Sequence, residues 1–338
     1  MTVNVGVIGT GMIGQDHIRR LTHVLSGARV AAVTDVDTDR ARTVADDLPG
    51  AATLHASGQD LIADPAVDAV VVTSWGPTHE EYVLATIAAG KQVFCEKPLA
   101  PTREACERIL DAEVAAGRRM VMVGFMRRYD LQYRAMKEVV TSREIGAPLL
   151  MHAAHRNPSV PDFFTSEMII TDTTVHDIDV ARWMLDEEIA AVRVLTPRVS
   201  SKARPGFSDP LLVLLEMTSG VLVDVEASVN AGFAYDIRGE VVGEDGTVEL
   251  SESAGVLTKR QGCWSGRVPA TWKERFARAF DAEFQAWVDA VAAGGTAGPS
   301  AWDGYAATVV CETGLEALRT GECVPVVLPE RPDLYKDR

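Results

Sequence analysis

The chain has 338 residues, of which 47% are hydrophobic and 24% are charged, and its formal net charge is −15. This length is typical of about two domains, and the composition is typical of a globular protein. The acidic balance disfavours binding to a nucleic-acid backbone, because no concentrated basic patch offsets it.

The sequence also predicts where the protein works. Residues 1–4 lead directly into a hydrophobic run without the basic and apolar regions of a targeting signal. No hydrophobic run approaches the roughly 20 residues that span a bilayer. The five cysteines lack Cys-x-x-Cys spacing, which disfavours a disulfide framework or a zinc site. We therefore expect a cytoplasmic protein with no membrane contact and no bound metal.

The first 124 residues alternate short hydrophobic runs with helical patterns. Helices such as 12–25 and 80–89 separate the runs. Strands are predicted at 3–8, 29–34, 69–73, 92–95 and 120–123. This alternation is typical of the α/β class, with a doubly wound parallel sheet.

The pattern changes after Gly124. In residues 221–230, hydrophobic and polar side chains alternate, which predicts a strand with one packed face. Residues 218–220 and 243–246 are typical of hairpin turns. A long helix with an aromatic stripe, a second helix at 302–319 and a strand at 324–328 follow; the stripe comprises Phe276, Phe280, Phe284, Trp287 and Val291. We expect an α+β region with a large, mostly antiparallel sheet.

A glycine turn directly follows the first predicted strand. It reads Gly9-Thr10-Gly11-Met12-Ile13-Gly14 and opens a predicted helix. Gly9 permits the tight turn, Gly11 lets the backbone approach a pyrophosphate, and Gly14 lets the helix pack closely on the sheet. The free N–H groups and dipole of the helix start favour an anion. Residues 9–14 are therefore predicted to bind a dinucleotide, with Met12 and Ile13 among the contacts.

Asp35 ends the second predicted strand, 21 residues beyond Gly14. A carboxylate at this place accepts hydrogen bonds from an adenosine ribose and disfavours a 2′-phosphate, so NAD is preferred over NADP. The nearby Arg40 weakens this argument for NAD over NADP. The alternative is an ordinary strand–helix turn with a solvated Asp35.

Three polar residues could supply chemistry beside a nicotinamide. Lys97 follows the strand 92–95, at the end of the sheet where ligands bind. Asp172 and His176 have i, i+4 spacing, which predicts one face of a helix that opens at Asp172. Histidine can accept a hydroxyl proton near neutral pH, and a lysine ammonium can stabilise the developing alkoxide. The set predicts hydride transfer from an alcohol, although each residue alone could have a structural role.

Further polar residues could bind a polyhydroxylated ligand. His155 and Asn157 lie on one face of a strand predicted at 151–157, and Arg127 and Tyr235 are further candidates. The alternative is that they lie on the wet face of the sheet. Trp75 and the aromatic stripe are predicted to be packing residues.

Residues 7–14, 96–98 and 172–177 resemble the glucose–fructose oxidoreductase, inositol dehydrogenase and rhizopine catabolism (Gfo/Idh/MocA) family, and the resemblance spans the whole chain. Residues 73–81, 155–158, 235–237 and 242–246 are most similar to its bacterial myo-inositol dehydrogenases. The resemblance implies a Rossmann domain at 1–124, which binds the dinucleotide. It also implies an α+β domain at 125–338, which binds substrate and forms oligomers through an open sheet face.

The same resemblance implies roles for individual residues. Lys97, Asp172 and His176 correspond to a catalytic triad with His176 as general base. Arg127, His155, Asn157 and Tyr235 correspond to substrate contacts. Ser74, His79, Glu96 and Lys97 correspond to further cofactor contacts.

The implied activity is the NAD-dependent oxidation of a small polyol, myo-inositol, to its 2-keto product by a homotetramer. Two positions depart from the family pattern: Phe280, where some close relatives carry tyrosine, and Met12, where smaller residues are frequent. Open alternatives are another inositol isomer or an aldose as substrate, and a redox-neutral glycosidase that retains NAD. A cofactor sensor without catalysis is disfavoured by the intact triad.

Overall fold

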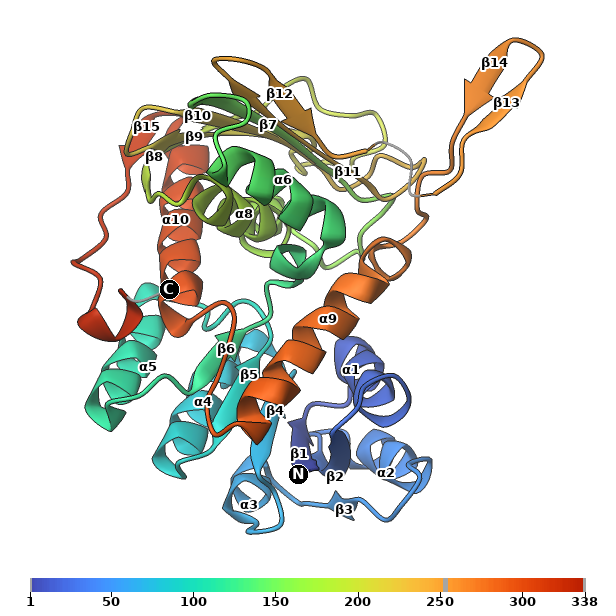
Figure 1. Ribbon diagram of the computed structural model, residues 1–338, viewed down its shortest axis with the longest axis vertical. Helices are drawn as coiled ribbons and strands as arrows, with labels where there is room; N and C mark the ends of the chain where they lie inside the picture. The colour runs from blue at the N-terminus through green and yellow to red at the C-terminus, as the bar shows by residue number, and fades with distance from the viewer. Residues whose placement is uncertain (1, 252–254, 337–338) are drawn as a thin grey trace. The chain divides into compact units, whose positions relative to one another are not determined.

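A computed structural model describes residues 2–251 and 255–336 of the chain (Figure 1). The chain forms two compact units. The first combines residues 1–125 with 280–308 and 329–338, and the second combines residues 126–279 with 309–328. The boundaries near residues 280 and 308 fall within the helices α9 (Trp272–Ala292) and α10 (Ala301–Thr320). Segments from the C-terminal part of the chain therefore complete the first unit.

The first unit contains a six-stranded sheet in the order β3-β2-β1-β4-β5-β6. Its strands are β1 (Val3–Ile8), β2 (Ala28–Thr34), β3 (Thr53–Leu54), β4 (Ala69–Val72), β5 (Gln92–Cys95) and β6 (Val121–Val123). Every neighbouring pair is parallel. The strand order reverses between β1 and β4, and ligands bind at the carboxyl ends of the strands at such a point. The predicted doubly wound parallel sheet is confirmed.

Helices connect these strands. They are α1 (Met12–His23), α2 (Thr38–Asp46), α3 (Gly58–Ala63), α4 (His79–Ala88) and α5 (Arg103–Ala116), with 3-10 turns at Gly76–Thr78 and Asp333–Tyr335. The second half of α9 packs against α1 and β5, because the Phe284 ring centroid lies 4.2 Å from those of both His17 and Phe94. The predicted aromatic stripe is buried at its first four positions, as expected for packing residues.

The second unit contains a seven-stranded sheet in the order β12-β11-β7-β10-β9-β8-β15. Its strands are β7 (Pro148–Arg156), β8 (Ile189–Leu195), β9 (Leu211–Met217), β10 (Leu222–Ser228), β11 (Asp236–Gly243), β12 (Thr247–Glu249) and β15 (Cys323–Pro325). Strands β7 and β10 run parallel and the other neighbours run antiparallel. A separate hairpin joins β13 (Thr258–Arg260) and β14 (Cys263–Ser265). The predicted mostly antiparallel sheet is confirmed.

The two faces of this sheet differ in polarity. On one face, Val223, Val225 and Ala227 are buried, and α6 (Leu131–Thr141) and α8 (Val175–Leu185) lie on one side of the sheet (Figure 1). The opposite face carries half-exposed ion pairs such as Arg156–Glu226. The alternation predicted for residues 221–230 is therefore confirmed, and its hydrophobic half forms the core of this unit.

The helix predicted to open at Asp172 begins earlier. Its chain enters a short helix α7 at Ser166–Met168 and a π-helical turn η3 at Ile169–Thr174 before α8 starts at Val175. The Thr174 hydroxyl donates to the carbonyl of Ile169, five residues earlier, at 2.8 Å. The expected helix start was wrong, because Asp172 lies inside a wider helical turn rather than at an N-terminus.

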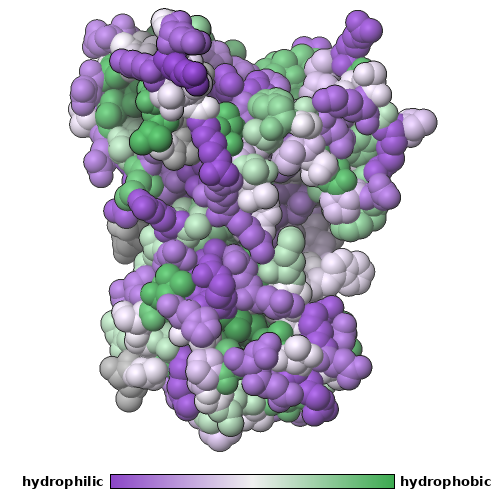
Figure 2. All heavy atoms as spheres, turned by 90° about the vertical axis from the view of Figure 1, so that its right-hand side faces the viewer, coloured by the Kyte–Doolittle hydropathy of each residue, from purple (hydrophilic) through white to green (hydrophobic). Residues whose placement is uncertain are grey.

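The surface view in Figure 2 shows a face on which hydrophilic residues predominate and hydrophobic ones form separate patches. Among the described residues, no helix combines the length and the hydrophobicity needed to cross a bilayer.

Truncation of Phe284 tests the contribution of α9 to the first unit. Phe284 is fully buried, so Phe284→Ala leaves a cavity and is expected to lower the free energy of unfolding by about 3–5 kcal/mol. Urea denaturation followed by circular dichroism measures the loss. The matched control Phe163→Ala removes a ring that is 72% exposed and is expected to change little. Equal stability of the two variants would contradict this packing role.

Candidate active site

The glycine turn of the first unit is closely packed on one side and open on the other. Gly9 has a φ of 99°, and a Cβ there would lie 2.6 Å from the Ser74 nitrogen. A Cβ on Gly14 would lie 2.0 Å from the Gly9 carbonyl oxygen. A Cβ on Gly11 would have no atom within 4 Å. Gly9 and Gly14 therefore permit the close approach of α1, and Gly11 leaves open space beside the backbone.

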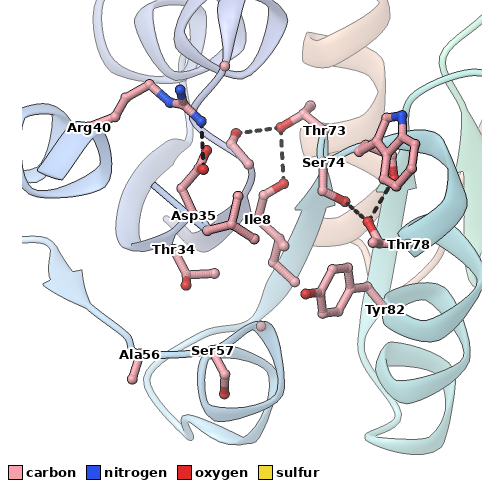
Figure 3. Close-up of a pocket in the computed structure, with 15 residues that line it drawn as sticks. Ile8, Thr34, Asp35, Arg40, Ala56, Ser57, Thr73, Ser74, Thr78 and Tyr82 are labelled. Carbon is pink, nitrogen blue, oxygen red and sulfur yellow. Dashed lines mark hydrogen bonds and ion pairs between the residues drawn. The ribbon is translucent and has the colours of Figure 1, made fainter. Parts of the chain in front are cut away.

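A pocket of about 430 Å³ adjoins this turn (Figure 3). It is lined by strand ends, the loops after them and residues of α2, α3 and α4: Ile8, Gly9, Gly11, Thr34, Asp35, Val36, Arg40, Ala56, Ser57, Gly58, Thr73, Ser74, Trp75, Thr78 and Tyr82. Gly11 is the N-cap of α1, and no side chain caps the helix there. The backbone N–H groups of the helix start are therefore available to bind an anion. These features fit a dinucleotide. When bound, NAD would supply the hydride acceptor.

Asp35 lies at one end of this pocket in a dense set of donors. Its Oδ2 accepts from the Thr10 backbone nitrogen at 2.6 Å, and its Oδ1 accepts from the Arg40 guanidinium at 2.7 Å. Burial raises the pKa of Asp35, but hydrogen bonds from Asp37, Thr10 and Arg40 outweigh burial, so the net pKa is lowered. A carboxylate held ionised at this place fits the ribose-binding role predicted for it.

The loop after β4 supplies the other wall of the pocket. The Thr73 hydroxyl donates to the Gly9 carbonyl at 2.7 Å, which holds the glycine turn, and the Ser74 and Thr78 hydroxyls lie 2.7 Å apart (Figure 3). Trp75 lines the pocket and is 77% exposed. The prediction that Trp75 is a packing residue was wrong, because its loop turns the side chain away from the core.

Several predicted cofactor residues are bonded within the protein. Glu96 is buried, with one oxygen 2.8 Å from Nε2 of His17 and the other accepting from the Lys97 backbone nitrogen at 3.1 Å. Gly124 makes room for it, since a Cβ there would lie 3.2 Å from the carboxylate. Both ring nitrogens of His79 contact backbone carbonyls, of Pro98 at 2.7 Å and of Ser74 at 3.0 Å.

These bonds hold the backbone around Lys97, which lies two residues beyond the end of β5 and is joined to Pro98 by a cis peptide bond. Burial lowers the pKa of His17 and of His79, although hydrogen bonds oppose the shift in both. Met12 is exposed and Ile13 is half-buried at the start of α1. Phe280 is buried, with the Arg20 guanidinium 4.7 Å from its ring centroid.

In the second unit, three predicted substrate residues meet in a buried polar cluster. Arg127 lies in the 3-10 turn η2 (Met126–Tyr129), His155 on β7, and Tyr235 just before β11. The Arg127 guanidinium lies 2.9 Å from Nδ1 of His155, and the Tyr235 hydroxyl lies 3.4 Å from its Nε2. The ring of His176 is 6.4 Å from that of His155. The sheet face that carries His155 is therefore the packed face, not a wet one.

Asp177 holds this cluster together, and the sequence reasoning gave it no role. Its carboxylate accepts from Arg127 at 2.5 Å and contacts Nδ1 of His155 at 2.9 Å. Burial raises the pKa of Asp177, but the charges of Arg127 and His155 and their hydrogen bonds outweigh burial and lower it. Burial lowers the pKa of Arg127, but Asp177 more than compensates and raises it. Both residues are thus charged and paired.

The remaining predicted residues lie on other elements. Asn157 follows β7 directly, is half-buried, and donates its backbone N–H to Ser228 at 2.7 Å. Asp172 lies in the π-helical turn and His176 at the start of α8. Lys97 belongs to the first unit, whereas Asp172 and His176 belong to the second.

The contacts of Thr10, His17 and Asp177 were missed. Thr10 lies within the predicted glycine turn, and Asp177 directly follows His176, so both residues belong to motifs identified from the sequence. Their roles depend on partners 25 residues away for Thr10, 79 for His17 and 50 for Asp177. No local spacing predicts such pairs.

Comparison with known proteins gives the family. Residues 3–125 match the oxidoreductase family with an NAD-binding Rossmann fold, and residues 133–249 match the GFO/IDH/MocA C-terminal domain. The chain belongs to the GFO/IDH/MocA family. The predicted family and its NAD-binding fold are confirmed.

Named relatives match over the full length. The chain is 56% identical to inositol 2-dehydrogenase 3 of Saccharopolyspora erythraea, over 99% of this chain and 98% of that one. It is 51% identical to the inositol 2-dehydrogenase of Serratia proteamaculans, over 99% of each. Among solved structures, the myo-inositol dehydrogenase of Lactobacillus casei in complex with NAD(H) and myo-inositol has a TM-score of 0.96 and 39% identity, covering 99% of this chain and 100% of that one.

Neutralising Asp177 tests the buried cluster. Asp177→Asn leaves Arg127 without its anion and is expected to lower the free energy of unfolding by about 3–5 kcal/mol at neutral pH. Because the folded pKa of Asp177 is depressed, its contribution is present above its unfolded pKa and is lost as the pH falls through the folded pKa. The deficit is therefore expected to shrink in acid.

Urea titrations between pH 7 and pH 3 measure that deficit. Asp186→Asn is the matched control, since the Asp186 side chain is 52% exposed where it pairs with Lys137 and such pairs contribute little. A deficit that is small, or that grows in acid, would contradict the assigned charge state.

Proposed function

We propose that this protein oxidises myo-inositol at carbon 2 with NAD as the hydride acceptor and yields 2-keto-myo-inositol (scyllo-inosose). The observation that carries the proposal is full-length identity of 50% or more to proteins named inositol 2-dehydrogenase. The buried Arg127–Asp177–His155 cluster supports it, because a polyol needs several fixed polar partners.

The proposed roles follow from the chemistry of alcohol oxidation. His176 accepts the hydroxyl proton, because a neutral imidazole is a base near physiological pH. The Lys97 ammonium stabilises the developing alkoxide, and Asp172 orients the two groups. Arg127, His155, Asn157 and Tyr235 bind the ring hydroxyls. The cofactor contacts are proposed at Gly9, Gly11, Met12, Ile13, Gly14, Asp35, Ser74, His79, Glu96 and Lys97.

The wider organisation is part of the same proposal. Residues 1–124 would act as the dinucleotide-binding domain and residues 125–338 as the domain for substrate binding and oligomerisation. The half-exposed sheet face around His152 and Arg156 would form subunit contacts in a homotetramer. We place the protein in the cytoplasm, because its cysteines lack disulfide spacing and none of the five described cysteines forms a disulfide.

A second candidate substrate is scyllo-inositol. The scyllo-inositol dehydrogenase of Lactobacillus casei, solved with NAD(H) and scyllo-inositol, has a TM-score of 0.87 and 25% identity, covering 96% of this chain and 99% of that one. Purified protein with NAD is therefore assayed at 340 nm with myo-inositol, scyllo-inositol, chiro-inositol and glucose in parallel. NADH formation that is fastest with myo-inositol supports the proposal. No NADH with any polyol would instead favour a redox-neutral NAD-retaining glycosidase.

Removal of the proposed base separates chemistry from binding. His176→Ala is expected to lower kcat at least about a hundredfold, because general-base catalysis contributes on that scale, while the Kd for NAD stays unchanged. Steady-state assays and a fluorescence titration with NADH measure the two quantities. His23→Ala, at an exposed position in α1, is the control. Full turnover by His176→Ala would exclude it as the base.

Replacement of Asp35 tests the ribose site. Asp35→Ser removes the carboxylate that disfavours a 2′-phosphate and is expected to raise the NADP/NAD ratio of kcat/KM about tenfold or more, since one charge-assisted hydrogen bond to NAD is lost as well. The ratio is measured with both cofactors at saturating inositol. An unaltered ratio would count against a ribose role for Asp35.

A further inference from the structure

Asp35 already has hydrogen-bond donors at both carboxylate oxygens within the chain. Its Oδ2 accepts from the Thr10 nitrogen at 2.6 Å and from the Thr10 hydroxyl at 3.1 Å. Its Oδ1 accepts from the Asp37 nitrogen at 2.9 Å and from the Arg40 guanidinium at 2.7 Å. A carboxylate offers about four acceptor positions. A ribose hydroxyl can therefore donate to Asp35 only when one of these donors leaves.

Arg40 is the donor best able to leave. Thr10 is fully buried in the glycine turn, and Asp37 donates a backbone N–H at the N-cap of α2. The Arg40 side chain is 39% exposed and also contacts Asp37 at 3.1 Å. Its Nε is buried and has no hydrogen-bond acceptor within residues 2–251 and 255–336. The guanidinium is thus partly exposed to solvent, and its buried Nε lacks an acceptor among the described residues.

The position of Arg40 gives it opposite effects on the two nicotinamide cofactors. Figure 3 shows its guanidinium directed at Asp35 from α2, on the wall of the pocket. It disfavours NAD, because it occupies an acceptor position on Asp35 that the ribose needs. It favours NADP, because it neutralises the carboxylate that repels a 2′-phosphate and because guanidinium groups bind phosphate oxygens strongly.

We propose that Arg40 competes with the adenosine ribose for Asp35, so that it weakens NAD binding and retains a measurable affinity for NADP. This inference rests on the proposed function only in taking a nicotinamide dinucleotide as the ligand of the pocket. It makes Arg40 a specificity-determining residue whose removal sharpens the preference for NAD.

The test is a binding titration of the full chain with NADH and with NADPH. Isothermal calorimetry gives both Kd values, and energy transfer from protein tryptophan to the reduced nicotinamide gives a second readout. Arg40→Met is expected to lower the Kd for NADH about two- to fivefold, the scale of a half-exposed ion pair. It is expected to raise the Kd for NADPH about tenfold or more, the scale of a lost charge-assisted contact.

Arg42→Met is the matched control. Arg42 lies on the same helix α2 and is exposed, so its replacement removes the same charge without touching Asp35, and both Kd values are expected to stay within about twofold of the wild type. Arg40→Gln, which keeps a polar side chain without the charge, is measured as a second variant and is expected to shift both Kd values in the same directions.

The result that overturns the proposal is an NADH affinity that is unchanged or weaker in both Arg40 variants. Weaker binding would mean that Arg40 contacts NAD directly. Because nucleotide binding needs no polyol, this result is independent of whether myo-inositol is the substrate, and a failed inositol assay would leave the two Kd values interpretable.

Discussion

The buried ion pair between Arg127 and Asp177 is the constraint around which the second unit is arranged. Both side chains are 2% exposed or less, and burial of either charge alone would cost several kcal/mol. The pair joins the 3-10 turn η2 to α8, and the contact of Asp177 with His155 joins both to β7. One carboxylate thus fixes three elements that are distant in sequence, and the His155 ring that it contacts lies 6.4 Å from the ring of His176.

In the first unit, too, carboxylates join elements that are distant in sequence, and there they accept hydrogen bonds mainly from backbone N–H groups rather than from a buried cation. Asp35 and Glu96 both end strands of the parallel sheet, and each accepts a backbone N–H from the turn that follows or adjoins it. Asp35 binds the glycine turn through Thr10, and Glu96 binds α1 through His17. Asp35 therefore shapes the pocket as well as charging it, and Glu96 fixes α1 beside the turn after β5. Their removal would alter geometry and electrostatics together, which is why the Arg40 variants are the cleaner probe of charge.

Much of the fold could be predicted because it depends on local periodicity. The five strands predicted in the first 124 residues occur within one residue of their predicted ends, and the alternation in residues 221–230 predicts which face of β10 is buried. The strand β3 could not be predicted, since two residues carry no periodic pattern. The π-helical turn could not be predicted either, because it depends on backbone hydrogen bonds between residues five apart, such as that from the Val175 N–H to the Ile170 carbonyl, rather than on side-chain spacing.

The candidate site was predictable in its residue types but not in its pairings. Arg127, His155 and Tyr235 were chosen as ligands for a polyol, yet the contacts that orient them come from Asp177, 50 residues from Arg127 and 22 from His155. Trp75 is predicted from the sequence to be a packing residue, but the loop after β4 exposes it. Local sequence therefore predicts which groups are present, whereas tertiary structure decides which of them are already engaged.

The overall charge makes these local pairings matter for cofactor choice. A chain with a net charge of −15 repels an anionic dinucleotide, and it repels one with an extra phosphate more strongly. Binding must rely on the short-range field of the α1 start, because Arg40, a cation on the pocket wall, is already paired with Asp35. Because Arg40 is paired with Asp35, a ligand in the pocket meets a nearly neutral ion pair rather than an unpaired carboxylate. Under the proposed competition, the selectivity for NAD depends on the energy of separating Arg40 from Asp35 as well as on the carboxylate.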